Sequence, residues 1–209
     1  REQRKLHRVD RRQRQICKRD RSRMEKIPRQ RAFSGLKIVI YGPESTGKST
    51  LTRQLTEYFE TVKADEFARD YLQEKFDQSG KPCEYTDLIP IAVGQRKAEN
   101  KAAKKAVNYL FCDTDALETY VYSMVYFDEV PAEIEDAARK SNYALYLLMN
   151  VDVPWTPDDL RDKPEDRKEM FERFEKELIV FQKKYSVING IGEDRIKNAI
   201  DAIQKLKHE

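Results

Sequence analysis

Residues 36–51 read LKIVIYGPESTGKSTL. The first six form a short apolar run rich in β-branched residues, which is typical of a buried strand. Residues 42–49 match the spacing GxxxxGK[ST]. We expect a helix over residues 48–58. A strand, a glycine-rich loop and a helix in this order are the context that a phosphate-binding P-loop requires, so the stretch predicts a nucleotide site.

The residues of this loop have distinct expected tasks. Gly42 and Gly47 permit the backbone angles that turn successive N–H groups inward, and the start of the helix adds partial positive charge. We expect Lys48 to reach the β- and γ-phosphates of ATP, and the Ser49 hydroxyl to complete a Mg²⁺ shell with water and phosphate oxygens. The residues expected to bind the nucleotide are Gly42, Glu44, Ser45, Thr46, Gly47, Lys48, Ser49 and Thr50.

On either side of the loop, apolar runs alternate with helical patterns. This alternation predicts an α/β protein with a P-loop NTPase fold: about five parallel strands with helices on both faces, as in nucleoside and nucleotide kinases. Besides 36–41, the expected strands are 61–66, 109–112, 143–149 and 185–188. Besides 48–58, the expected helices are 67–76, 86–107, 115–127, 132–140, 169–184 and 193–207.

The charge of the chain is unevenly distributed. The 209 residues carry a formal net charge of +3, yet residues 1–34 hold 14 basic and 4 acidic residues. We therefore expect a basic tail over 1–34, disordered or forming an isolated polar helix, and a kinase domain over 35–209. Met24 is the expected biological start, with 1–23 non-native. The alternative is an Arg-rich arm that binds nucleic acid.

Composition excludes several classes of protein. The longest uninterrupted apolar stretch, Tyr143–Met149, is far shorter than the roughly 20 residues of a membrane span, and the charged start resembles no signal peptide. Three cysteines and the absence of a signal predict a reducing cytoplasm. His7 and His208 are the only histidines, so a histidine-based triad or zinc site is not expected. The chemistry must use carboxylates, Lys, Arg, Ser, Thr and backbone amides.

A second acidic position supports the P-loop interpretation. Leu110-Phe111-Cys112 is an apolar strand that ends at Asp113, which is the Walker B pattern. We expect Asp113 to hold Mg²⁺ or a water bound to it. The alternative is a helix N-cap, a position that aspartate favours. For Asp115, the two alternatives are a helix cap and a contact with the substrate.

A small kinase also needs a carboxylate on the acceptor side and a mobile arginine lid. Glu66, with Asp65 as second choice, follows the second strand and is expected to take the proton of a hydroxyl nucleophile, while Arg69 neutralises the transferred phosphate. Residues 153–167 form the expected lid, in which Arg161 and Arg167 close over the phosphates. The alternatives are a solvated helix start for the first group and a plain surface loop for the second.

These motifs resemble a known family. GPESTGKSTL, EFARDY, the later YTD and GQ, FCDTD and PWTPDDLR are similar to the ribosylnicotinamide kinase domain of bacterial NadR-type proteins, and the resemblance spans roughly residues 36–204. It implies ATP-dependent phosphorylation of the 5′-hydroxyl of nicotinamide riboside, giving nicotinamide mononucleotide. Only 35 residues precede the first strand, so we expect a stand-alone kinase without the family's adenylyltransferase domain.

The resemblance also suggests contacts with the acceptor. It implies that Gln95 bonds the carboxamide of the substrate, and that Trp155 and Tyr71 stack on the cationic pyridinium. Glu66, Arg69, Asp113 and Asp115 complete the implied substrate site. A polar helix face is the alternative for Gln95, and a packing anchor is the alternative for Trp155.

Two other functions remain open. One is a P-loop kinase for another nucleoside, nucleotide or small metabolite. The other is an ATP-driven switch or binding module that uses the basic tail on nucleic acid. The expected partner is a small-molecule nucleoside and not a membrane. The sequence does not decide the oligomeric state or the choice between ATP and GTP.

Overall fold

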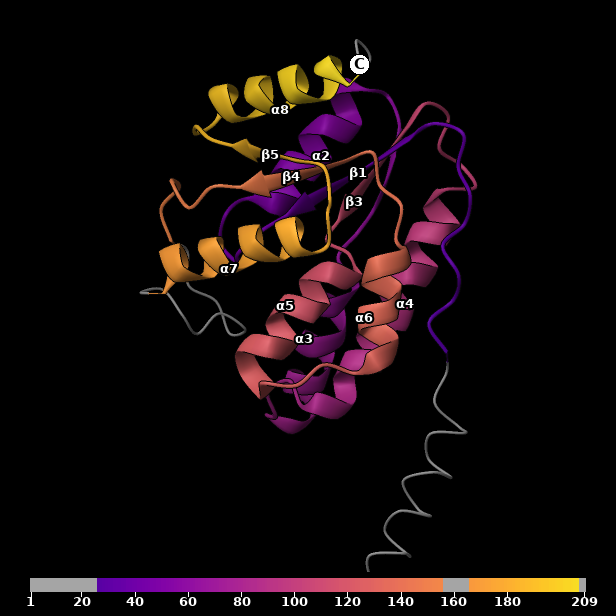
Figure 1. Ribbon diagram of the computed structural model, residues 1–209, viewed down its shortest axis with the longest axis vertical. Coiled ribbons are helices and arrows are strands. Elements are labelled where there is room, and N and C mark those ends of the chain that lie inside the picture. The colour runs from indigo at the N-terminus through magenta and orange to yellow at the C-terminus, as the bar shows by residue number, and fades with distance from the viewer. Residues whose placement is uncertain (1–25, 156–165, 207–209) are drawn as a thin grey trace, which may run out of the picture.

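The computed structural model describes residues 26–155 and 166–206, and its centre is a sheet of five parallel strands (Figure 1). The strands lie in the order β2-β3-β1-β4-β5, so β1 is central and pairs with β3 on one side and β4 on the other. This confirms the predicted fold class. The strands are β1 (Leu36–Tyr41), β2 (Val62–Ala64), β3 (Tyr109–Asp113), β4 (Leu145–Met149) and β5 (Tyr185–Ile188).

Helices cover both faces of the sheet (Figure 1). One face carries α2 (Lys48–Tyr58) and α8 (Glu193–Lys205). The other face carries α4 (Leu88–Ala102), α5 (Ala116–Phe127), α6 (Ala132–Lys140) and α7 (Arg167–Val180). A 3-10 turn (Tyr85–Asp87) precedes α4, and α3 (Phe67–Ser79) packs against α4. In the described part of the chain, no helix has both the length and the apolar character of a membrane span.

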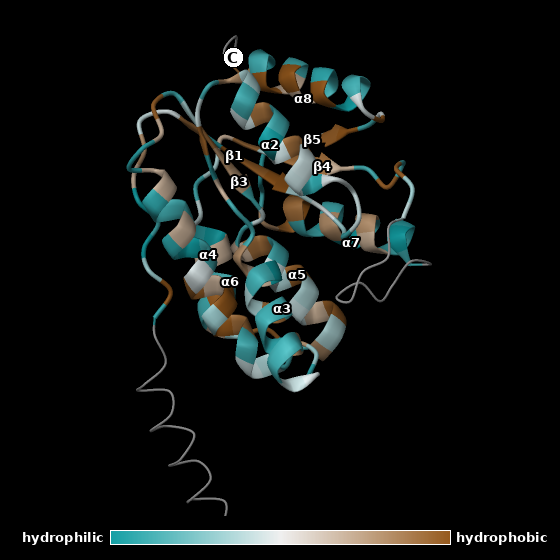
Figure 2. Cartoon of the chain, turned by 180° about the vertical axis from the view of Figure 1, so that it is seen from behind, coloured by the Kyte–Doolittle hydropathy of each residue, from teal (hydrophilic) through white to brown (hydrophobic). Residues whose placement is uncertain are grey.

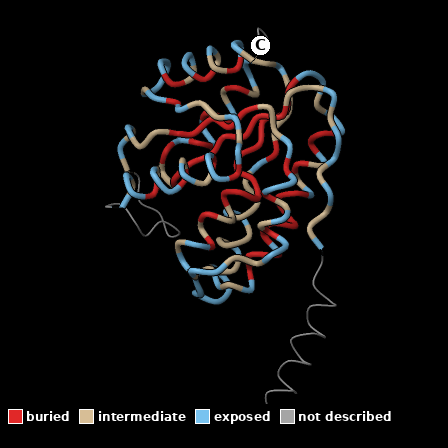
Figure 3. Tube along the Cα trace, in the orientation of Figure 1, coloured by how far each residue is buried: buried red, intermediate tan, exposed pale blue. Residues whose placement is uncertain are grey.

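The alternation of side chains along β1 divides the core into two halves. Ile38 and Ile40 pack toward α2 and α8, whereas Val39 and Tyr41 pack toward α5 and α7. All four side chains are fully buried. Both faces of the central strand are covered, so its sequence is apolar without interruption. Figure 2 shows the apolar strands between helices with polar outer faces, and Figure 3 shows the central strands β1, β3 and β4 buried.

Most predicted elements are present, and the differences lie at their ends. The third helix from the N-terminus was expected to reach residue 107, but α4 ends at Ala102 because the backbone turns there toward β3, with Lys105 N–H bonded to the carbonyl of Ala102. The helix expected to end at residue 184 ends at Val180, since Gln182 takes a left-handed conformation with φ of 54°. Short-range patterns miss such turns because neighbouring strands fix them.

Residues 26–34 correct one expectation. The backbone N–H of Arg31 bonds to Asn100 at 2.6 Å, and Gln30 bonds to Glu99 at 2.7 Å. Ile27 also packs against an apolar cluster of α4 and α6. The chain over 26–34 is therefore packed against α4, whereas the sequence predicted a disordered tail or an isolated polar helix over 1–34, because α4 supplies partners that the tail sequence does not reveal. Residues 1–25, with the expected start at Met24, lie outside the described residues.

The core between β1 and α7 predicts a measurable stability difference. Phe174 is fully buried and its ring lies 4.8 Å from that of Tyr41. We expect Phe174→Ala to lower the free energy of unfolding by about 3–5 kcal/mol, because it leaves a cavity. On the same helix Ile179 is 60% exposed, so Ile179→Ala should change the free energy of unfolding by less than about 0.5 kcal/mol. Urea unfolding measures both; similar losses would contradict this description of the core.

Candidate functional site

The candidate site lies at the carboxyl edge of the sheet. The P-loop follows β1, the Asp65-Glu66 pair follows β2, and Asp113 is the last residue of β3. Because β1 is the central strand, the P-loop occupies the middle of this edge, beside the loops after β3 and β4. Ligands of parallel α/β proteins bind at this edge, so the topology brings the predicted residues together.

Three residues of the P-loop adopt backbone angles that favour glycine. Gly42 has φ of 138°, Gly47 has φ of 81°, and Ser45 between them has φ of 55°. A Cβ on Gly42 would also lie only 3.2 Å from the backbone N and O of Met149. The two glycines therefore have the conformational role that the sequence predicted. Ser45 adopts the same left-handed region without being glycine, which is typical of residues held under strain at functional sites.

Lys48 is the charged centre of the site. It is 8% exposed, and its ammonium group donates to the carbonyl oxygens of Gly42 at 2.7 Å and Pro43 at 3.0 Å. It also forms an ion pair with Glu118 Oε1 at 3.2 Å. Burial by itself lowers the pKa of Lys48, but neighbouring carboxylates outweigh burial and leave that pKa above its ordinary value.

Ser49 and Asp113 meet as the sequence predicted. The Ser49 side chain hydrogen-bonds to Asp113, whose Oδ1 has no partner among the described residues although it is buried. Burial, with a contribution from the charge of Glu66, raises the pKa of Asp113 to about 6. A hydroxyl beside an unused carboxylate oxygen fits a Mg²⁺ ion that takes its remaining ligands from water and phosphate. The described residues include no cluster of three or more acidic, His or Cys ligands that would hold a metal alone.

The structure separates the two candidate bases. Asp65 is exposed and its side chain forms an ion pair with Lys63. Glu66, the N-cap residue of α3, is half-buried, and its charge acts on Lys48, Asp113 and Glu118. Of the two, Glu66 is therefore the one whose charge acts on the residues of the site, and its role as the base stays a prediction.

Glu118 is a site residue that the sequence reasoning missed. It lies in the first turn of α5, is 4% exposed and contacts Lys48. Burial raises its pKa to about 8, with Lys48 opposing this effect and the charges of Glu66 and Asp113 adding to it. The spacing Asp115-x-x-Glu118 is that of an ordinary capping box. The sequence therefore gives no reason to expect a contact between Glu118 and Lys48. Only the packing of α5 beside the P-loop turns Glu118 toward Lys48.

Two arginines donate hydrogen bonds to backbone carbonyls of the P-loop. Arg195, which the sequence reasoning also missed, donates to the carbonyls of Thr46 and Gly190 and pairs with Asp152. Arg195 lies in the first turn of α8, where a positive charge is unfavourable because it opposes the helix dipole. This unfavourable position is the feature of the sequence that could have singled out Arg195. Arg167 donates to the carbonyls of Val153 at 2.8 Å and Ser45 at 3.3 Å. Arg161 lies outside the described residues.

Two predicted substrate contacts have their polar atoms engaged by the protein itself. Gln95 is buried; its oxygen accepts from the N–H of Phe67 at 2.8 Å, and its nitrogen donates to the carbonyl of Asp113 at 3.1 Å. It therefore ties the loop after β2 to the end of β3. Asp115 is the N-cap of α5, and its second oxygen accepts from Tyr146 at 2.7 Å. Of its two predicted roles, the structure gives Asp115 the cap.

The remaining predicted contacts are less buried than Gln95 and Asp115. Tyr71 is half-buried, its ring stacks on Phe67 at 5.9 Å, and its hydroxyl donates to Asp87. Arg69 lies exposed on the first turn of α3, and Thr50 is exposed on α2. Trp155 is half-buried below the guanidinium of Arg167, 5.9 Å away. Trp155 is thus in contact with a residue that also contacts the P-loop.

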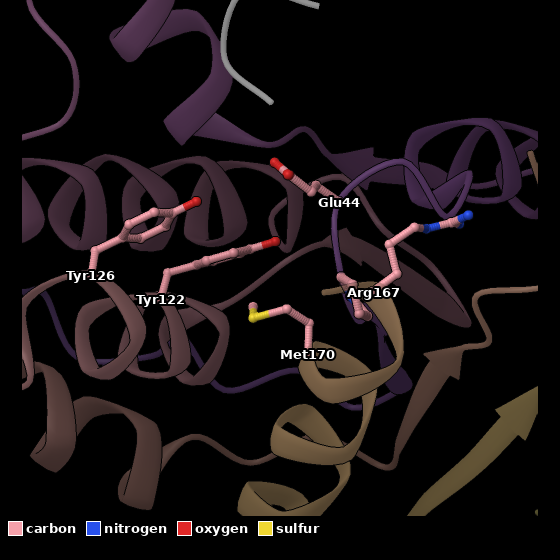
Figure 4. Close-up of a pocket in the computed structure, with 6 residues that line it drawn as sticks. Glu44, Tyr122, Tyr126, Arg167 and Met170 are labelled. Carbon is pink, nitrogen blue, oxygen red and sulfur yellow. The ribbon is translucent and has the colours of Figure 1, made fainter. Parts of the chain in front are cut away.

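A small aromatic pocket adjoins the P-loop. Figure 4 shows Tyr122 and Tyr126 of α5 extending toward Glu44 of the loop, with Met170 of α7 beneath them. Burial raises the pKa of Tyr122 well above its ordinary value, and the charges of Glu118, Glu44 and Glu66 add to this effect. Aromatic rings and carboxylates therefore line the same side of the site.

Comparison with known families identifies the chain. The sequence model of the family described as AAA domain matches residues 37–195, which include the P-loop, Asp113 and Arg195. The chain belongs to this AAA domain family. The match extends from β1 into the first turn of α8 and so covers every described residue of the candidate site.

Relatives of this AAA domain confirm the resemblance to the NadR-type kinase domain. The Trifunctional NAD biosynthesis/regulator protein NadR of Salmonella typhimurium is 31% identical over 124 residues, 59% of this chain and 30% of that protein. Its Escherichia coli counterpart is 31% identical over 134 residues, 63% of this chain and 33% of that protein. The chain thus spans about a third of the length of these relatives.

Solved structures share the fold of the AAA domain. A crystal structure of NadR protein in complex with NR matches with a TM-score of 0.72 and 25% identity, over 84% of this chain and 52% of that one. A deoxyadenosine kinase from M. mycoides with bound dATP matches with a TM-score of 0.59 and 14% identity, over 81% and 99% of the two chains. The fold is that of P-loop nucleoside and nucleotide kinases.

The raised pKa of Glu118 predicts a pH dependence of stability. Its pKa is about 8 in the folded chain against an ordinary 4.5, so the folded state binds the proton more tightly. The free energy of unfolding should therefore fall as pH rises from about 5 to about 8. In Glu118→Gln the fall should be smaller by on the order of 1 kcal/mol. Urea titrations at each pH test this, and parallel curves would contradict it.

Proposed function

We propose that this AAA domain is an ATP-dependent phosphotransferase with a nucleoside acceptor, and that its substrate is nicotinamide riboside. The reaction transfers the γ-phosphoryl group to the 5′-hydroxyl and gives nicotinamide mononucleotide. The observation that carries the proposal is the buried P-loop lysine, Lys48, on which the charge of the half-buried carboxylate Glu66 acts. The match to a NadR structure in complex with NR supports this choice of acceptor.

Glu66 is the proposed proton acceptor. Its side chain belongs to the same charge cluster as Lys48, so a hydroxyl placed between them would face both a base and the transferred group. As the hydroxyl oxygen bonds to the γ-phosphorus, its proton passes to Glu66, and the bond between the β–γ bridging oxygen and that phosphorus breaks to release ADP. Asp65 takes no part, because it pairs with Lys63 outside the cluster.

The charge of the transferred group is matched by cations of the chain. We assign Lys48 to the β- and γ-phosphates, and Ser49 and Asp113 to Mg²⁺, which when bound neutralises phosphate charge and orients the phosphates. Arg69 lies on the acceptor side, while Arg167 lies against the P-loop through Ser45. Arg161 keeps its proposed role in a lid. Electrostatic positioning of this kind is the main source of catalysis in phosphoryl transfer.

The acceptor is proposed to lie among aromatic rings. Tyr71 and Trp155 are the candidates for stacking on the cationic pyridinium. Gln95 is assigned an indirect role: it fixes the backbone beside Glu66 and Asp113 instead of bonding the carboxamide. Cys83 and Cys112 are free thiols, which is consistent with a proposed place of action in the reducing cytoplasm.

A panel of acceptors tests the proposed reaction. Wild-type protein with Mg²⁺ and ATP should release ADP with nicotinamide riboside, and mass spectrometry should detect the mononucleotide. Lys48→Ala should abolish turnover because the phosphates lose their main cation. Nicotinic acid riboside, adenosine, deoxyadenosine and thymidine complete the panel. Turnover of another nucleoside without any of nicotinamide riboside would reject the acceptor, and ADP release without a phosphorylated product would reject the kinase.

The two neighbouring carboxylates give a matched test of the base. Glu66→Gln should lower kcat by about 10²–10⁴-fold, because the hydroxyl loses its proton acceptor. Asp65→Asn removes the same charge one residue away and should keep a kcat close to that of the wild type. Steady-state kinetics with saturating ATP measure both. An effect of Glu66→Gln confined to KM, or an equal loss in Asp65→Asn, would move the role elsewhere.

A further inference from the structure

One carboxylate oxygen of Glu118 accepts no hydrogen bond from the described residues. Its Oε1 pairs with Lys48 at 3.2 Å, whereas its Oε2 is buried and no hydrogen-bond partner reaches it within the described residues. The residue is only 4% exposed. A buried carboxylate oxygen without a donor costs free energy, so its position indicates a donor that arrives from outside the chain.

The side chain of Lys48 has partners within the protein that a bound nucleotide must replace. Its ammonium group has three donors, and these face the carbonyls of Gly42 and Pro43 and the carboxylate of Glu118. To reach a phosphate chain, Lys48 must give up at least one of these partners. The ion pair with Glu118 is its only link outside the P-loop among the described contacts.

The surroundings of Glu118 place it on the acceptor side. The charges of Glu66 and Asp113 act on it, and it in turn acts on Tyr122, one turn further along α5. Its free oxygen therefore lies in the acidic part of the site, where further anions such as phosphates are disfavoured and a neutral donor such as a hydroxyl group is favoured.

We propose that Glu118 has two successive partners: it holds Lys48 before the triphosphate binds, and it then accepts a hydrogen bond from a sugar hydroxyl of the nucleoside. This inference rests on the proposed kinase function and adds a link between its two substrates. When the phosphates draw Lys48 away, Glu118 loses its cation and gains affinity for a donor. The two substrates therefore strengthen each other's binding, and the effect is reciprocal.

Calorimetry with Mg²⁺ and AMP-PNP at pH 9, above the pKa of about 8 that Glu118 has in the folded chain, tests the first partner. In Glu118→Gln, Lys48 is no longer restrained by a carboxylate, so AMP-PNP alone should bind at least about fivefold more tightly than in the wild type. Loss of any nearby negative charge also favours a triphosphate, so Glu66→Gln, which lacks a direct contact with Lys48, is the matched control. An effect of Glu118→Gln no larger than that of Glu66→Gln overturns the proposal.

Titration with nicotinamide riboside tests the second partner. In the wild type, AMP-PNP should strengthen its binding by about 5–150-fold, and in Glu118→Gln by less than about twofold. KM for the nucleoside should rise about tenfold, while KM for ATP should not rise. Unchanged coupling in Glu118→Gln overturns the proposal. Glu57→Gln removes an exposed, paired glutamate of α2 and should match the wild type in every measurement.

Failure of the proposed acceptor can be distinguished from failure of the proposal for Glu118. If wild-type protein binds no nicotinamide riboside, the proposed acceptor is rejected, and the AMP-PNP comparison still decides whether Glu118 restrains Lys48. If Glu118→Gln unfolds at a lower temperature than assays allow, Glu118→Asp replaces it. The aspartate side chain is one methylene shorter than that of glutamate, so its carboxylate should not reach Lys48. The same tighter binding of AMP-PNP is therefore expected, and an unchanged affinity would contradict the proposal that Glu118 restrains Lys48.

Discussion

Lys48 carries a full charge into a position that is 8% exposed, and the rest of the site is arranged around this buried ammonium group. A buried cation is tolerated only where acceptors or anions replace the lost water. Here two loop carbonyls and Glu118 do so, and the charges of Glu66 and Asp113 add to them. Because the same lysine has to serve phosphates, the groups that stabilise it in the folded chain also compete with its ligand.

The sheet makes this arrangement possible. Five parallel strands end at one edge, and the central position of β1 puts the P-loop between the loops of its neighbours. Gln95 then fixes the loop after β2 to the end of β3, and Arg195 fixes the P-loop to the loops after β4 and β5. Neither side chain is assigned a direct contact with a substrate. Both stabilise loops whose backbone groups would otherwise remain without partners.

Membership of the AAA domain family and the kinase fold set the class of chemistry, while individual carboxylates distinguish this site. Glu66 and Asp65 are neighbours in sequence, yet Lys63 draws one of them away. Asp113 and Glu118 both have raised pKa values because both are buried, but only Asp113 hydrogen-bonds to Ser49, the hydroxyl proposed to bind Mg²⁺. Burial and the nearest partner, more than residue type, give each carboxylate its role.

The sequence alone determined the parallel α/β fold, the P-loop and the pairing of Ser49 with Asp113, because these depend on local spacing and on the order of strands and helices. It did not reveal Glu118, whose spacing from Asp115 resembles an ordinary cap, or Arg195, which lies 149 positions from its P-loop partner Thr46. The family resemblance suggested that Gln95 bonds the substrate, with a polar helix face as the alternative. Tertiary structure decided these roles, since contacts between distant segments depend on how α4, α5 and α8 pack against the sheet, which no short-range pattern encodes.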